Sequence, residues 1–130
     1  MFTLLAENLH FGEGPRWHNN KLWFSDFYQH SVMTLDLSGK IEKIVEIPNQ
    51  PSGLGWLPNG DLLIVSMLDR KIMKYSNNEL SLHSDLSKLT PFRCNDMVVD
   101  KDGDAYVGNF GSLHHARAVS YTHLTLPTKA

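Results

Sequence analysis

The feature that most constrains the fold is a motif that occurs three times along the chain. When the three copies are aligned, Trp17 corresponds to Trp56 and then to Val99, at spacings of 39 and 43 residues. A period in this range is typical of repeat architectures, in which each unit buries its apolar face against its neighbour. The copies occupy residues 14–26, 53–66 and 96–109.

Each copy has the pattern of short β-strands joined by tight turns. Two-residue turn signals lie between its apolar runs, at Asn19-Asn20, Asn59-Gly60 and Asp102-Gly103. Such pairs favour two-residue hairpins of type I′. In the first two copies a second hairpin follows, with predicted turns at Ser38-Gly39 and Asn77-Asn78. Four short strands in roughly 40 residues, with no helical pattern, describe one propeller blade. We therefore predict an all-β fold, a β-propeller of about two and a half blades over residues 1–111.

The length of the chain bears on how complete this propeller is. Closed propellers contain about 4–8 blades, so we expect the 130 residues to be the N-terminal fragment of a longer protein. Residues 112–130 diverge from the repeat, and we expect them to be a non-native tail. From about Ala118 the tail resembles translated sequencing-adapter read-through. The alternative is a divergent third strand, since residues 121–126 alternate weakly.

Composition excludes several classes of protein. The net charge of −2 gives no basic footprint for nucleic acid and no polybasic patch for a membrane surface. No apolar run approaches the roughly 20 residues that span a bilayer. Cys94 is the single cysteine, which fits a reducing compartment, and the N-terminus lacks the basic start of a secretory signal. We expect a cytoplasmic protein, and no feature indicates an obligate protein partner.

Aligning the repeats places polar side chains together at one mouth of the central channel. Glu13, Ser52 and Asn95 each precede the first strand of their unit, which lies nearest the channel. Two residues earlier, on the same strand face, come Phe11, Gln50 and Arg93. The second strand returns to this mouth and ends at Asp26, Ser66 and Asn109.

The predicted mouth is rich in oxygen donors, with one guanidinium from Arg93. Calcium takes about 6–8 oxygen ligands, so this set suits a hard cation. Zinc fits less well, because no Cys or His falls at a repeat-equivalent position. An Arg beside a metal would hold substrate oxygens or a developing anion. For Asp26 and Asn109, ordinary turn chemistry is an equal alternative.

Three other features invite a functional interpretation that we do not favour. The acidic run from Asp100 to Asp104 lacks the spacing of an EF-hand loop and fits a hairpin turn. No nearby feature marks a base that would activate Cys94, so we expect it to face the blade core. The three tryptophans, Trp17, Trp23 and Trp56, are also expected in the blade core.

Residues 12–17, 50–54 and 93–100 together resemble the first three blades of the SMP-30/gluconolactonase family (regucalcin-like proteins). The resemblance covers roughly residues 8–111. It implies a six-bladed propeller that hydrolyses sugar lactones with one divalent cation on its axis. Calcium is the first expectation, with zinc, manganese or magnesium as alternatives. By motif match, Glu13 is the metal ligand, and Arg93 and Asn95 hold the substrate.

The remaining ligands of the family, including its catalytic base, come from later blades. We therefore expect weak metal binding and no catalysis from this chain by itself. The alternative function is a non-catalytic propeller that displays its loops to a protein or a small ligand, since one scaffold hosts many functions.

Overall fold

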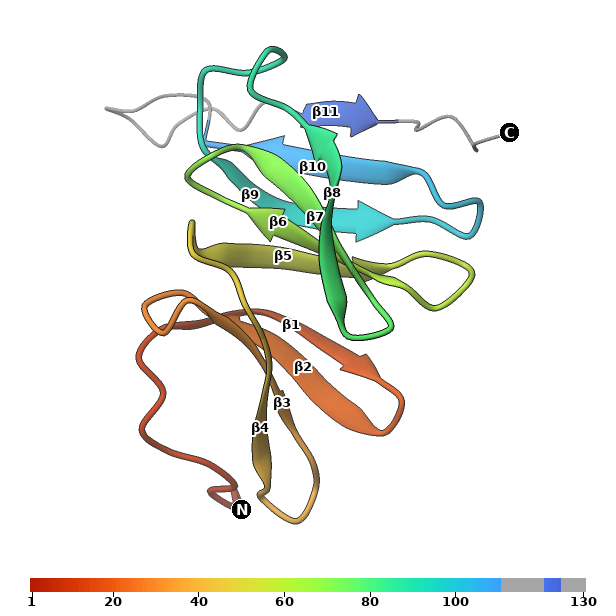
Figure 1. The fold of residues 1–130 in the computed structure, drawn as a ribbon. Helices are drawn as coiled ribbons and strands as arrows, with labels where there is room; N and C mark the ends of the chain where they lie inside the picture. The colour runs from red at the N-terminus through yellow and green to blue at the C-terminus, as the bar shows by residue number, and fades with distance from the viewer. Residues whose placement is uncertain (111–120, 125–130) are drawn as a thin grey trace.

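The computed structural model describes residues 1–110 and 121–124, and these form β-strands joined by turns and loops. In Figure 1 the strands gather into three antiparallel sheets, which are successive blades. The first blade contains β1 (Gly12–His18), β2 (Lys21–Asp26), β3 (Ser31–Leu35) and β4 (Ile41–Glu46). The second contains β5 (Pro51–Trp56), β6 (Leu62–Ser66), β7 (Lys71–Ser76) and β8 (Glu79–Asp85). The third contains β9 (Cys94–Val99), β10 (Ala105–Asn109) and β11 (Tyr121–Leu124). The all-β propeller prediction is confirmed.

Two of the predicted tight turns have the expected form. Asn19 and Asn20 have φ values of 51° and 60°, and Asn77 and Asn78 have values of 50° and 63°. Two successive positive φ values define the type I′ turn, which Asn tolerates because its short polar side chain suits the left-handed region. Strands β1 and β2, and strands β7 and β8, are therefore joined directly.

The other three turns are wider than predicted, because only one residue of each pair is left-handed. The positive φ values are 91° at Gly39, 94° at Gly60 and 89° at Gly103. At two of these turns an aspartate opens the loop by accepting two backbone N–H groups. Oδ1 of Asp100, for example, accepts from the N–H groups of Asp102 and Asp104 over 2.9 and 3.0 Å. The aspartate thus replaces ladder hydrogen bonds that a two-residue turn would have made.

Apolar clusters fill the spaces between neighbouring blades. Between the first and second blades, Val32 and Ile47 pack with Leu54 and Ile64, and all four are buried. Between the second and third blades the buried cluster is Leu63, Val65, Ile72, Leu86, Cys94, Met97, Ala105 and Val107. Successive side chains of a strand point to opposite faces of its sheet, so β6 contributes alternate residues to the cluster on each side of the second blade.

The expectation for the tryptophans is right for two of the three. Trp23 and Trp56 are half-buried and pack against the cluster between the first two blades. Trp17 is 58 % exposed, which corrects the prediction. Side chains alternate between the two faces along β1, so Trp17 points outward and the next residue, His18, points inward. His18 stacks on Trp56, with ring centroids 3.9 Å apart.

The inner strands β1, β5 and β9 follow one another along the channel (Figure 1) and approach closely at glycines. A Cβ atom on Gly53 would lie 2.5 Å from the backbone nitrogen of Met97. One on Gly55 would lie 2.5 Å from Cγ2 of Val99. The absence of side chains at these positions lets β9 lie against β5, and this contact positions the site described below.

Strand β11 lies antiparallel to β10, as the third strand of the last blade. This is the position that the alternative interpretation, a divergent third strand, gives to residues 121–126. The rest of the predicted tail, residues 112–120 and 125–130, lies outside the described residues. The origin of the tail stays a prediction.

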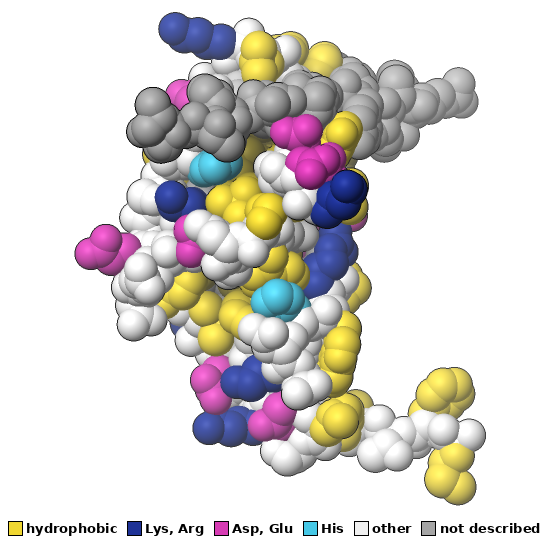
Figure 2. Space-filling view, turned by 90° about the vertical axis from the view of Figure 1, so that its right-hand side faces the viewer, with side chains coloured by type: hydrophobic (Ala, Val, Ile, Leu, Met, Phe, Trp, Pro, Cys, Tyr) yellow, Lys and Arg dark blue, Asp and Glu magenta, His cyan; other side chains and the backbone are white. Residues whose placement is uncertain are grey.

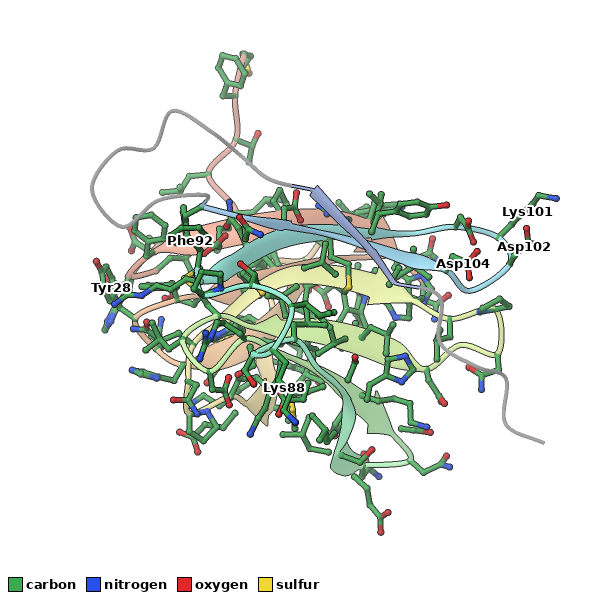
Figure 3. All side chains as sticks on the ribbon, turned by 90° about the horizontal axis from the view of Figure 1, so that it is seen from above. Tyr28, Lys88, Phe92, Lys101, Asp102 and Asp104 are labelled. Carbon is green, nitrogen blue, oxygen red and sulfur yellow. The ribbon has the colours of Figure 1, made fainter. Side chains whose placement is uncertain are left out.

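Polar and aromatic side chains are distributed differently over the two ends of the blades. In Figure 3, Tyr28 and Phe92 lie at one end of the blades, and Asp102 and Asp104 lie at the opposite end. On the face shown in Figure 2, acidic and basic side chains are interspersed among the described residues. Within residues 1–110 and 121–124, no helix has the length and apolar character needed to cross a membrane.

Candidate functional site

Three residues at equivalent repeat positions meet at one mouth of the channel. Glu13 lies on β1, Ser52 on β5 and Asn95 on β9. The hydroxyl Oγ of Ser52 lies 2.8 Å from Oε2 of Glu13 and 3.1 Å from Oδ1 of Asn95. Hydrogen bonds therefore connect one side chain from each blade, although 39 and 43 residues separate Ser52 from its two partners.

The chemistry of the three groups indicates how the hydrogens are shared. The Ser52 hydroxyl carries one hydrogen, so it donates to only one oxygen at a time. The ionised carboxylate of Glu13 is the stronger acceptor. The second, longer contact of the Ser52 hydroxyl is with the amide oxygen Oδ1 of Asn95. An amide oxygen has two lone pairs, so Oδ1 of Asn95 can also bind a ligand.

The environment of Glu13 alters its acidity. Burial raises the pKa of Glu13 above 4.5, and the negative charge of Asp96 raises it further. The hydrogen bond from Ser52 opposes both effects by favouring the ionised form. A half-buried carboxylate is stabilised more strongly by a nearby cation than an exposed carboxylate is, because water screens the attraction less.

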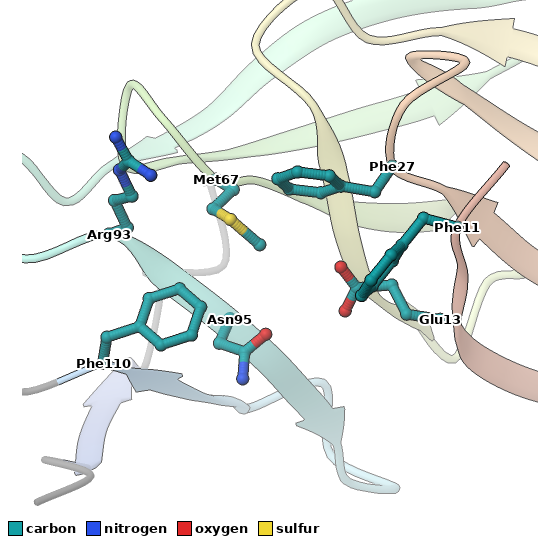
Figure 4. A pocket seen from close by; sticks show the side chains of 7 residues that line it. All are labelled: Phe11, Glu13, Phe27, Met67, Arg93, Asn95 and Phe110. Atoms are coloured by element: carbon teal, nitrogen blue, oxygen red, sulfur yellow. The ribbon is translucent and has the colours of Figure 1, made fainter. Parts of the chain in front are cut away.

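Glu13 and Asn95 face a cavity of about 340 Å³ at this mouth (Figure 4). Arg93 lies at its edge, with the guanidinium away from Glu13 and Asn95 in this view. Among the described residues, the lining is Phe11, Glu13, Phe27, Met67, Arg93, Asn95 and Phe110. Three of the predicted site residues thus line one cavity, and four of its lining residues have apolar side chains.

Asp26 has a different place from the one its repeat position suggested. It is fully buried, and its carboxylate accepts hydrogen bonds from the N–H groups of His10, Phe11 and Gln29 and from Nε2 of Gln29. Burial raises the pKa of Asp26, but the four hydrogen bonds outweigh that effect and lower it. Asp26 therefore holds the segment before β1 in place through backbone hydrogen bonds. This is the role that the alternative prediction, ordinary turn chemistry, gives to it.

Gln50, Ser66 and Asn109 are also absent from the described lining of the cavity. Gln50 has a φ of 72°, and its carbonyl accepts the N–H of Met67 over 2.9 Å. Ser66 donates to Oδ1 of Asp69 over 2.6 Å. Asn109 is buried and opposes Cys94 in the ladder between β9 and β10.

One ion pair near the site has no counterpart among the sequence-based predictions. Nη2 of Arg16, on β1, donates to Oδ1 of Asp96 over 2.7 Å and to the carbonyl of Met97 over 3.0 Å. The contact links the first blade to the third. No pattern within a single repeat predicts it, because it depends on how closely β9 approaches β5.

The interpretation of Cys94 as a core residue is confirmed. Its side chain is 1 % exposed and packs with Leu63 and Met97 between the blades. Burial raises the pKa of the Cys94 thiol to about 11. The thiol therefore stays protonated at neutral pH, when it is a poor nucleophile.

The residues at the cavity fit a hard cation in part. A carboxylate and an amide are oxygen ligands of the kind that calcium prefers. Residues 1–110 and 121–124 contain no cluster of three or more His, Cys, Asp or Glu side chains that is suited to bind a metal ion. Glu13 and Asn95 therefore offer two of the roughly 6–8 oxygens that calcium takes.

Comparison with solved structures shows that the fold of this chain is similar to that of several larger proteins. A gluconolactonase from Xanthomonas campestris superposes with a TM-score of 0.76 at 18 % identity, over 93 % of this chain and 46 % of that one. Regucalcin from Agrobacterium tumefaciens, described as a calcium-binding protein, gives 0.69 at 24 % identity, over 88 % and 40 %. Virginiamycin B lyase from Staphylococcus aureus gives 0.62 at 17 % identity, over 89 % and 42 %. The chain thus spans less than half the length of each of these proteins.

No curated protein matches the sequence. The model of one protein family, described as the SMP-30/Gluconolactonase/LRE-like region, matches residues 11–125. The match includes Glu13, Ser52, Arg93 and Asn95, and it includes strand β11. The chain belongs to the SMP-30/Gluconolactonase/LRE-like family.

Proposed function

We propose that this chain is the N-terminal part of a metal-dependent hydrolase of sugar lactones. Glu13 is the ligand that it contributes to a divalent cation, with calcium as the expected ion. Arg93 and Asn95 bind oxygens of the substrate. The chain by itself is inactive, since the carboxylate that serves as base belongs to a later part of such a propeller.

The observation that carries this proposal is the hydrogen-bonded set of Glu13, Ser52 and Asn95. Each blade supplies one member, and all the members come from equivalent positions. A carboxylate with a raised pKa beside a cavity is typical of a functional site. Family membership and the likeness to a gluconolactonase add support.

Hydrolysis of a lactone adds water across the bond between the acyl carbon and the ring oxygen. The ring opens to a hydroxy acid, so no oxidant or reductant is needed. A bound divalent cation would polarise the lactone carbonyl and lower the pKa of water. The chain's own residues hold and orient the reactants, and such positioning can contribute a large part of a rate enhancement.

The experiment uses a longer protein in which this chain is joined to the remaining blades of the proposed propeller. This longer protein is assayed on aldonolactones with calcium, zinc, manganese or magnesium, and with a chelator. We expect turnover that requires a metal and that falls by at least about a hundredfold in the Glu13→Gln variant. Absence of metal-dependent turnover on every lactone, or full activity of Glu13→Gln, would refute the proposal. Ligand binding without turnover would support the non-catalytic alternative.

A further inference from the structure

An ion pair crosses the middle blade beside the set formed by Glu13, Ser52 and Asn95. Arg16 lies on β1, three residues after Glu13, and Asp96 lies on β9, directly after Asn95. Nη2 of Arg16 donates to Oδ1 of Asp96 over 2.7 Å. The pair therefore joins the strand that carries Glu13 to the strand that carries Asn95, across the intervening strand β5.

The pair occupies two positions at which the second blade has glycine. In the alignment of the repeats, Arg16 corresponds to Gly55, and Asp96 corresponds to Gly53. A Cβ atom on Gly53 would lie 2.9 Å from Cα of Asp96, so a side chain on Gly53 would crowd Asp96. Because the blade between them carries no side chain at either position, the side chain of Arg16 can reach Asp96.

Both members of the pair are held by further hydrogen bonds. Nη1 of Arg16 donates to the carbonyl of Pro15 over 2.9 Å, and Nη2 also donates to the carbonyl of Met97 over 3.0 Å. Oδ1 of Asp96 accepts the N–H of Met97 over 2.8 Å. Because the planar guanidinium presents its N–H groups in a fixed fork, these contacts constrain how far β9 lies from β1.

The exposure of the pair argues against a mainly stabilising role. The side chains of Arg16 and Asp96 are 29 % and 63 % exposed, and ion pairs in contact with water contribute little to folding. The place of the pair has more consequence than its strength. The groups of a binding site have to be held within about 0.5 Å of the productive geometry, and this pair adjoins both Glu13 and Asn95.

Charge alone predicts that Arg16 weakens the binding of a cation at Glu13, because like charges repel. On that ground, removal of Arg16 would tighten cation binding, since Asp96 would keep its negative charge. That charge already acts on Glu13, whose pKa it raises. A role in positioning predicts the opposite, namely weaker binding when Arg16 is lost. A single substitution therefore separates the two roles.

We propose that Arg16 and Asp96 are positioning residues, which hold Glu13 and Asn95 at the separation that a shared ligand requires. The ion pair and the hydrogen bonds of Ser52 then connect the first blade to the third in two ways. This inference rests on the proposed function for the presence of a cation at Glu13.

The test is an NMR titration of the 130-residue chain with calcium, followed at the side-chain amide of Asn95. We expect Arg16→Met to bind calcium about tenfold more weakly than the natural chain, a typical cost of losing a group that orients a ligand. Arg16→Lys keeps the charge but loses the planar fork, and its affinity should lie between the two. Without calcium, the nuclear Overhauser effect between the Asn95 amide and the Cβ protons of Ser52 should weaken in Arg16→Met.

The matched control is Lys40→Met, which also removes one positive charge and one ion pair. Nζ of Lys40 lies 3.1 Å from Oε1 of Glu42, and Lys40 is exposed and is not among the described lining residues. Its substitution is expected to change neither the calcium affinity nor the Overhauser effect. Calcium binding in Arg16→Met that is as tight as in the natural chain or tighter would overturn the inference, as would equal losses in Arg16→Met and Lys40→Met.

Failure of the natural chain to bind calcium would count against the proposed cation at Glu13 and not against the role of Arg16. The Overhauser effect in the calcium-free chain then decides the inference by itself. A weaker effect in Arg16→Met, with no change in Lys40→Met, supports it, and an unchanged effect in Arg16→Met overturns it.

Discussion

The hydroxyl of Ser52 lies 2.8 Å from Oε2 of Glu13, and it joins the innermost strands of the first two blades. Ser52 is fully buried, and its other neighbour is Asn95 of the third blade. A single side chain thus positions the expected metal ligand beside an expected substrate-binding residue. Ser52 is a positioning residue, because it acts on a ligand through Glu13 and Asn95.

Replacing Ser52 with alanine should leave Glu13 without its side-chain donor. The pKa of Glu13 should then rise further, since the hydrogen bond from Ser52 lowers it. We expect about tenfold weaker calcium binding, because removing a group that orients a ligand typically costs that much. The pKa is measured by NMR titration of the Glu13 carboxyl carbon, and the affinity by calorimetry.

Ser66→Ala is the matched control for that substitution. Ser66 is also a buried serine that donates to a carboxylate, in this case Asp69 over 2.6 Å. Both substitutions should cost about 1 kcal/mol of stability, the typical value of one hydrogen bond. Only Ser52→Ala should change the pKa of Glu13. An equal change in both variants would contradict a local role for Ser52.

The raised pKa of Glu13 predicts a conflict between stability and function. The folded chain holds the proton of Glu13 more tightly than the unfolded chain does, so this contribution to stability is present below pH 4.5. It is lost as the pH rises through the folded-state pKa. Glu13→Gln should therefore melt at a higher temperature than the natural chain at about pH 7, with little difference at about pH 4. Thermal unfolding at the two pH values measures this, and a lower melting temperature at neutral pH would contradict it.

Asp26 should behave in the opposite way. Its pKa is lowered, so its contribution to stability is present above the ordinary value of 3.8 and is lost as the pH falls through the folded-state pKa. The two carboxylate oxygens of Asp26 accept four hydrogen bonds, and Asp26→Asn keeps only one of these oxygens. The substitution should therefore lower the free energy of unfolding by about 2 kcal/mol. Urea unfolding at neutral pH measures the loss. Asp85→Asn, at the exposed end of β8 and with a backbone hydrogen bond from Ser87, should change stability by less than about 0.5 kcal/mol.

Gly53 is expected to be intolerant of any side chain. The Cβ of Gly53→Ala would lie 2.5 Å from the nitrogen of Met97 and 2.8 Å from the carbonyl carbon of Asp96. The backbone of β9 would have to move, at a cost of about 3 kcal/mol. Gly12→Ala, whose new Cβ would lie 3.8 Å from Leu9, should cost less than about 0.5 kcal/mol. Similar losses of stability in the two variants would contradict the close approach of β5 and β9.

The repeat explains why the sequence predicts so much of this structure. A motif that recurs after 39 and 43 residues assigns Glu13, Ser52 and Asn95 to equivalent places, and closed packing of blades brings equivalent places together. The Asn19-Asn20 turn is likewise local, since two asparagines suffice to specify two left-handed residues. Blade order and these contacts are therefore accessible without a structure.

What the sequence does not predict depends on distances between blades or on competition for hydrogen bonds. The contact of Arg16 with Asp96 depends on the glycine-mediated approach of β9 to β5. The carboxylate of Asp26 has the residue type of a metal ligand, but four nearby donors occupy it. At Asp102-Gly103, the side chain of Asp100 captures two backbone N–H groups and widens the turn.

Calcium binding to the 130-residue chain tests most directly whether the meeting of the first three blades makes part of a cation site. Isothermal titration is carried out on the natural chain, on Glu13→Gln and on Asp102→Asn, which removes an exposed charge at the opposite end of the blades (Figure 3). We predict weak binding, with a dissociation constant on the order of 10⁻³ M, that Glu13→Gln abolishes and Asp102→Asn preserves. Binding that is unchanged in Glu13→Gln would contradict the assignment of Glu13 and with it the account of the site.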